Sequence, residues 1–286
     1  MLAFISIPCL LLLVLLAALA EKNLNPGTGL HKIISIITAV VPSVLWITVF
    51  YSQDRQNPEP KSFVFKILIL GALVQKAVYI PVISLIFPEG NTSYLALDYI
   101  STVLMTAVIQ EAVKLLAIRY SIYSGREFDE KIDGVVYGSA LGLGFAAMTS
   151  LDSILATGGA RLSNAASMAV VEAFAHASIT GLSCYFLSAS KYKKFSVFRL
   201  TAGLLAASAL NALMQFLLNS VTRVGFNVNY YLGLIPAGIL AVLIFGILVK
   251  ISSAYEKDAS LTKPAAPTPQ KEFLAVLPVW VILVIT

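Results

Sequence analysis

Long uninterrupted apolar runs constrain this chain more than any other feature. A helix needs about 20 apolar residues to cross a bilayer, and about eight runs reach that length: 3–20, 33–51, 63–87, 95–120, 134–157, 165–189, 197–219 and 230–250. Hydrophobic residues make up 58% of the chain and charged residues 12%, whereas soluble domains average about 45–50% and about 25%. The runs are continuous rather than alternating, which excludes a transmembrane barrel. The sequence predicts an all-α, polytopic helical membrane protein.

The two ends of the chain extend beyond a predicted membrane core at 33–251. Residues 1–32 form an N-terminal transmembrane helix and loop. Residues 252–272 contain a Lys-Pro-Ala-Ala-Pro-Thr-Pro stretch that is typical of a tether. The apolar segment 273–286 is short for a span, so it is a surface anchor, a partner-contacting segment or a span cut short.

The first apolar run has a second interpretation as a signal peptide. Ala18-Leu19-Ala20 precedes Glu21 in the manner of a signal-peptidase site. Residues 1–9 contain no Lys or Arg, which a cleaved signal would carry. We expect a retained helix that acts as a signal anchor.

Basic residues predict the orientation. The loops and flanks after the second, fourth, sixth and eighth runs hold most of the 20 Lys and Arg residues. Because cytoplasmic loops carry this excess, we expect a multi-pass protein of the inner (cytoplasmic) cell membrane, with its N-terminus and residues 252–272 in the cytoplasm. The same rule explains the net charge of +5 without nucleic acid as a partner.

Polar side chains inside the runs are the candidate functional groups, because ionisable residues are costly in a membrane. Glu172 and His176 are four residues apart and share a helix face. Imidazole and carboxylates that converge from separate helices can form a zinc site. Counting from the cytoplasmic helix ends, we expect polar groups from five helices in one middle-to-outer slab of the membrane, made by Lys76, Glu111, Thr149, Asp152, Glu172, His176, Asn211 and Gln215.

Each of these groups also has a structural interpretation. Glu111 and Lys114 can neutralise each other within one helix turn, and His176 can be a core histidine. Glu172 can bind His176 alone. Lys76 pairs with a carboxylate, for which Asp98, Asp152 and Glu172 are the candidates. Asn211 and Gln215 can join helices by hydrogen bonds.

Ordered motifs occur between about residues 40 and 220. They are Pro42–Trp46, Asp54–Lys61, Gly71–Leu73, Gln110–Lys114, Phe128–Glu130, Asp133–Gly138, Gly142–Ala147, His176–Ala177, Gly181, Tyr185–Leu187 and Asn211–Phe216. This series resembles the PrsW-type intramembrane proteases, within the CAAX-protease/PrsW superfamily. The resemblance implies a metal-dependent enzyme with carboxylates and histidines as ligands or acid–base groups, acting on single-span regulatory proteins.

The resemblance carries over incompletely at the active-site positions, so the chain is a divergent member. Glu111, Lys114 and His176 match the family pattern. Neutral residues stand where the family pattern has ionisable ones, namely Gln110, Thr149, Asn211 and Gln215. A catalytic zinc needs about three protein ligands and an open position, and the matched residues supply two.

Two functional hypotheses follow. We favour a non-catalytic, cofactor-free scaffold subunit that binds lipid and a transmembrane helix of another membrane protein. The alternative is an active zinc protease that cleaves membrane-embedded regulatory proteins. Its displaced site would use His176, Glu172 and Asp152, assisted by Glu111 or Lys76. The candidate catalytic residues are Glu111, His176, Lys114, Glu172 and Asp152, and the candidate metal ligands are His176, Glu111, Glu172 and Asp152.

Overall fold

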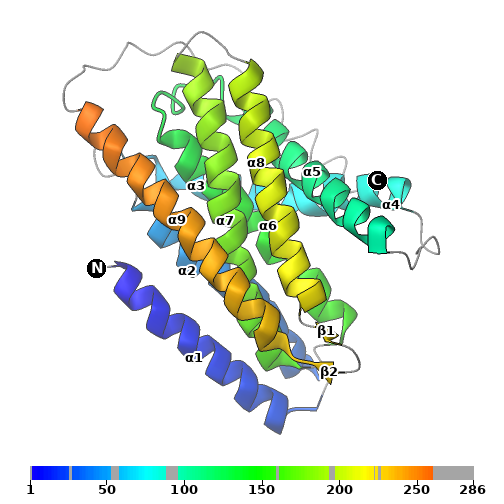
Figure 1. The fold of residues 1–286 in the computed structure, drawn as a ribbon. Coiled ribbons are helices and arrows are strands. Elements are labelled where there is room, and N and C mark those ends of the chain that lie inside the picture. The colour runs from blue at the N-terminus through cyan, green and yellow to red at the C-terminus, as the bar shows by residue number, and fades with distance from the viewer. Residues whose placement is uncertain are drawn as a thin grey trace.

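A computed structural model describes residues 2–25, 28–52, 58–87, 96–158, 161–192, 197–221, 223–224 and 227–259. Within these residues the chain forms a bundle of helices (Figure 1). The elements are α1 Leu2–Asn23, α2 Gly29–Tyr51, α3 Lys61–Val74, the π-helix η1 Gln75–Tyr79, α4 Ile80–Ile86, α5 Ala96–Ser121, α6 Asp133–Ala156, α7 Leu162–Tyr192, α8 Val197–Phe216, the π-helix η2 Leu217–Val221, β1 Arg223–Val224, β2 Asn227–Val228 and α9 Tyr230–Ala259.

The predicted membrane class is confirmed. In the described part of the chain, eight helical segments are long and apolar enough to cross a membrane. The third comprises α3, η1 and α4 as one interrupted helix. The last helix continues to Ala259, so residues 252–259, expected to be tether, are helical. Residues 260–286, including the predicted apolar segment, lie outside the described residues, and the proposed domain division remains a prediction.

Helix α6 is the centre of the bundle, since 83% of its span is buried against 28% for the α3–α4 span. Glycines allow this. A Cβ on Gly144 would lie 1.7 Å from the Leu68 carbonyl oxygen of α3. A Cβ on Gly142 would lie 2.5 Å from the carbonyl oxygen of His176 on α7. The two glycines lie on different sides of α6, so this helix makes close backbone contact with α3 through Gly144 and with the imidazole-bearing α7 through Gly142.

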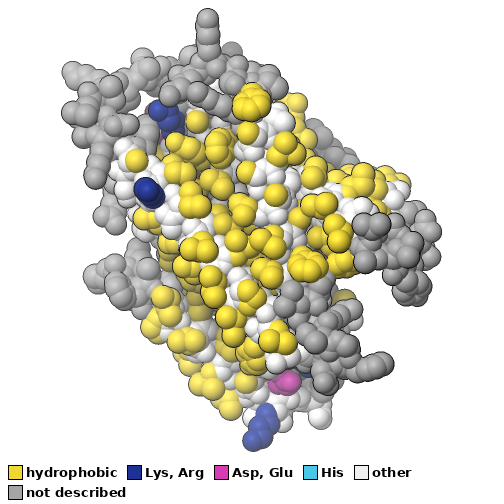
Figure 2. Space-filling view, viewed as in Figure 1, with side chains coloured by type: hydrophobic (Ala, Val, Ile, Leu, Met, Phe, Trp, Pro, Cys, Tyr) yellow, Lys and Arg dark blue, Asp and Glu magenta, His cyan; other side chains and the backbone are white. Residues whose placement is uncertain are grey.

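Apolar side chains cover most of the visible surface between the two ends of the bundle (Figure 2). Leu11 on α1, Leu85 on α4 and Leu243 on α9 are all more than half exposed. In a soluble protein such a surface would be exceptional, but it is the surface that lipid requires. The exposed apolar belt supports the same conclusion as the span lengths.

The bundle has two distinct ends. We call the end where α2, α5 and α7 stop and α3, α6 and α8 begin the basic end, and the other the far end. At the far end, Glu21 of α1 accepts hydrogen bonds from the backbone N–H (2.9 Å) and hydroxyl (2.6 Å) of Ser163. Ala17 and Ala20 are buried in a cluster with Ile154. Helix α1 is therefore packed on the bundle.

Candidate intramembrane site

A buried ion pair on α5 contacts the imidazole of α7. The Lys114 Nζ atom lies 2.5 Å from Glu111 Oε1, and both side chains are fully buried. The same Nζ atom lies 3.2 Å from His176 Nδ1 and 4.9 Å from the centre of the Phe145 ring. Asn211 of α8 donates to Glu111 Oε1 at 2.7 Å. Because the carboxylate binds both an ammonium and an amide, its charge is balanced within the protein.

Three amide side chains extend this pair into a hydrogen-bonded network that we call the amide ladder: Gln110, Asn211 and Gln215. Asn211 Nδ2 donates to Gln110 Oε1 at 2.9 Å, and Gln215 Nε2 donates to Asn211 Oδ1 at 3.2 Å. At its ends, Gln110 donates to the Tyr79 hydroxyl (2.9 Å) and Gln215 accepts from Thr106 (3.3 Å). The amides satisfy one another, as interhelical hydrogen bonds do in membranes.

Beside the amide ladder lies a cavity of about 190 Å³ between α5, α6, α7 and α8. Glu172 and His176 face it from successive turns of α7. Glu172 accepts a hydrogen bond from Ser150 at 3.1 Å, and no described residue forms an ion pair with it. The lining residues are Gln110, Thr149, Ser153, Glu172, Ala175, His176, Ile179, Asn211, Met214, Gln215, Leu218 and Asn219.

Asp152 lies elsewhere. Its carboxylate accepts hydrogen bonds from Lys76 at 2.8 Å and from Gln75 at 3.4 Å, and both residues lie on the π-helix η1. This confirms the predicted pairing of Lys76 with a carboxylate and selects Asp152 from the three candidates. Asp152 is not part of the cavity lining. The structure therefore places His176 and Glu172 on one cavity and Asp152 outside its lining.

The donors present at the buried pair do not fit a zinc ion. Glu111 Oε2 is buried without a hydrogen-bond partner, so one carboxylate oxygen is available. Beside it stand the Lys114 ammonium, which cannot act as a ligand, and one imidazole. Among the described residues, neither His176 nor any carboxylate predicted as its co-ligand belongs to a group of three metal-ligating side chains whose ligand atoms lie within 4.8 Å of one another.

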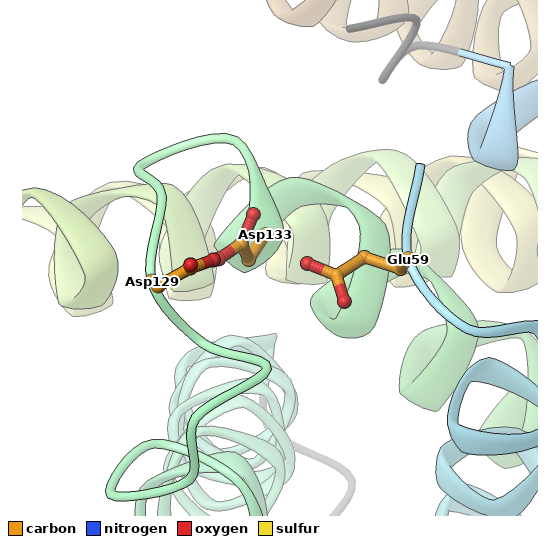
Figure 3. Close-up of side chains that lie close together, drawn as sticks. All are labelled: Glu59, Asp129 and Asp133. Atoms are coloured by element: carbon orange, nitrogen blue, oxygen red, sulfur yellow. The ribbon is translucent and has the colours of Figure 1, made fainter. Parts of the chain in front are cut away.

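One such group does occur in the described chain, near the basic end: Glu59, Asp129 and Asp133 (Figure 3). Glu59 and Asp133 are buried, and carboxylate oxygens suit hard cations such as Mg²⁺ rather than zinc. The Tyr137 hydroxyl donates to Glu59, and the Glu130 backbone N–H donates to Asp133. These bonds tie the segment before α3 to the start of α6 and to the loop that precedes it.

In the sequence, the three acidic residues of this group stand out only as parts of the family-like motifs. Two signals were available, namely a Glu between two prolines and two Asp residues four apart at a helix start. Neither signal predicts that Glu59 and Asp133 lie close together, because two spans separate them in the sequence.

Spanning helices around a polar cavity define a polytopic membrane protein with an intramembrane site. The family model described as PrsW family intramembrane metalloprotease matches residues 59–251. The chain belongs to this family, which confirms the resemblance noted in its motifs. The matched region contains all five candidate catalytic residues and begins after α2.

Curated relatives agree with this assignment. Protease PrsW of Geobacillus kaustophilus is 28% identical over 202 residues, which cover 70% of this chain and 85% of the relative. Protease PrsW of Bacillus subtilis is 26% identical over 192 residues, 66% of this chain and 85% of the relative. No solved structure matches the chain.

Proposed function

We propose that this chain is a PrsW-family protein that binds a membrane-spanning helix of another membrane protein without cleaving it. The amide ladder is the observation that carries the proposal. Its three members stand at positions where the family pattern has ionisable groups, and they are satisfied by one another and by neighbouring hydroxyls. An amide neither titrates near neutral pH nor competes well for zinc, so this side of the cavity offers hydrogen bonds rather than acid–base chemistry.

The cavity supports the part of the proposal that concerns binding of a membrane helix. It is lined mainly by amides, hydroxyls, Glu172 and His176, in a region that the spans place inside the bilayer. Polar groups at this depth stabilise helix–helix association, since lipid cannot satisfy them. The partner we infer is therefore a transmembrane helix that supplies polar groups to this cavity.

An active protease is the second candidate, and one observation favours it beyond family membership. Glu172 and His176 lie one turn apart and line the same cavity, so a carboxylate and an imidazole could both reach a bound peptide. Under this alternative, Glu172 would hold or remove a proton at the reacting group. Zinc as a cofactor belongs to this alternative alone.

We also propose that the basic end faces the cytoplasm. The loops and flanks of this end hold most of the Lys and Arg residues of the chain, and cytoplasmic loops carry such an excess. The same placement puts residues after Ala259 in the cytoplasm. Single cysteines at positions 124 and 158, tested with a membrane-impermeant thiol reagent on intact cells, check this assignment. Labelling of position 124 alone would contradict it.

Full-length protein in phosphatidylcholine vesicles tests the non-cleaving proposal. Single-span model peptides are added, and their binding is followed by fluorescence energy transfer and their length by mass spectrometry. We expect the wild type to bind peptides that remain intact. Peptide fragments made by the wild type and not by a His176→Ala variant would establish the protease instead.

A further inference from the structure

We propose that Glu172 is the recognition group of the cavity, which selects a membrane helix that presents a Lys or Arg side chain at the depth of Glu172. This inference rests on the proposed helix-binding function and adds the chemistry of the partner. It comes from the pairing of charges within the membrane, where each ion needs a partner.

Two of the cations in the membrane interior are already paired. Lys114 bonds Glu111 at 2.5 Å, and Lys76 bonds Asp152 at 2.8 Å. Among the described side chains that line the cavity, Glu172 is the carboxylate, and no described residue forms an ion pair with it. It accepts a hydrogen bond from Ser150, a neutral hydroxyl.

The position of Glu172 makes an unpaired carboxylate costly. It lies ten residues after Leu162, the first residue of α7, which is about 15 Å along the helix from the far end. Water cannot fully solvate a charge there, and a buried ion without a partner is strongly destabilising. A cation from a partner helix would form a charge-assisted hydrogen bond with it.

The shape and lining of the cavity fit one long basic side chain. At about 190 Å³, the cavity is smaller than the pockets of about 300–1,000 Å³ that hold drug-sized ligands. The hydroxyls of Thr149 and Ser153 line it beside Glu172, and their oxygens can accept the remaining hydrogens of an ammonium or guanidinium. No described Lys or Arg lines the cavity, and the Lys114 ammonium, which contacts His176, is already paired with Glu111.

Three synthetic single-span peptides of Leu and Ala test the inference. Each carries one variable residue at the depth of Glu172: Lys, Met or Glu. Full-length protein is reconstituted in phosphatidylcholine vesicles, and binding is measured by fluorescence energy transfer. We expect the Lys peptide to bind about tenfold or more tightly than the Met peptide, because it pairs a buried charge, and the Glu peptide to bind more weakly than either.

Glu172→Gln is the decisive variant. The amide keeps the size of the side chain and can still accept from Ser150, so the fold is retained while the charge is lost. We expect the preference for Lys over Met to disappear. Glu21→Gln is the matched control, since it makes the same substitution at the far end of α1, outside the cavity. It should keep the full preference.

The outcomes separate this inference from the proposed function. Equal binding of the Lys and Met peptides to the wild type, or a preference that survives in Glu172→Gln, would overturn the role of Glu172 and leave helix binding in place. If none of the peptides bound, both proposals would fall. Cleaved peptides would overturn the non-cleaving function, while the Lys preference would still be decided by the binding data.

Discussion

Two carboxylates inside the membrane, Glu111 and Glu172, have opposite surroundings. Glu111 is fully buried and accepts hydrogen bonds from the Lys114 ammonium and the Asn211 amide. Glu172 faces a cavity and accepts a hydrogen bond from Ser150. Glu111, Lys114 and the amide ladder bond one another, and we call this group the closed network. Glu172 lies outside it and has no ion pair among the described residues.

This difference predicts that Glu111 contributes to stability and that Glu172 contributes to recognition of a partner. A buried group whose partners lie in the same chain holds helices together, and removing one partner leaves the other unpaired. A group that lacks an internal counter-ion contributes little to the fold and is available to a ligand. We therefore expect substitutions in the closed network to affect stability, and substitutions of Glu172 to affect binding.

The largest effect should come from Lys114→Met. Loss of the ammonium leaves Glu111 buried without its counter-ion, which should lower the free energy of unfolding by about 3–5 kcal/mol. Detergent-solubilised protein titrated with a denaturing detergent gives the value. The Lys114→Met, Glu111→Gln double variant should recover much of the loss. A double variant no more stable than Lys114→Met would show that the pair is not the cause.

Gly144→Ala should cause the second-largest loss of stability, because the new Cβ would lie 1.7 Å from a backbone oxygen of α3. Overpacking of this kind costs about 1–3 kcal/mol, and a backbone neighbour cannot rotate away. Gly246→Ala on α9 is the control, since nothing lies within 4 Å of its Cβ. The two thermal midpoints are compared. Equal midpoints would contradict the close packing of α6 on α3 that supports the closed network.

Asn211→Ala tests the amide ladder itself. It removes the donor to Glu111 and Gln110, and unsatisfied buried groups cost about 1–3 kcal/mol. Denaturant titration should show this loss. Thr149→Ala removes a hydroxyl that bonds only within its own helix, so it serves as the comparison and should cost less. If Thr149→Ala lowered the free energy of unfolding more than Asn211→Ala, the amide ladder would not be a stabilising element.

Glu172→Gln should have the smallest destabilising effect, with no loss of the free energy of unfolding, because it removes a buried charge that has no described counter-ion and breaks no internal pair. The same denaturant titration measures it. A loss as large as that of Lys114→Met would mean that Glu172 is part of the closed network after all. That result would remove the contrast between the two carboxylates.

Hydropathy and spacing predicted much of the fold, since apolar length alone determines which segments span a membrane. All eight predicted spans correspond to helical segments. The π-turns at Gln75–Tyr79 and Leu217–Val221 were not predicted, because a one-residue insertion in a helix leaves hydropathy unchanged. They rotate the residues that follow them, and one of them carries Lys76.

The candidate site was predicted in part, for a physical reason. Spacing within a helix identifies side chains that share a face, as for Glu172 and His176, but it does not fix which neighbouring helix that face meets. Thr149 and Asp152 are three residues apart, yet Thr149 lines the cavity and Asp152 contacts η1 of the α3 span. A rotation of about 60° between such positions is enough to separate two partners.

Zinc content of the full-length, detergent-purified protein tests the central claim most directly. Wild type and His176→Ala are incubated with zinc, dialysed and analysed for metal per chain. The account predicts no stoichiometric zinc bound to the intramembrane site, and therefore equal zinc content in the two proteins. About one zinc per wild-type chain, lost in His176→Ala, would show a functional metal centre and contradict the account.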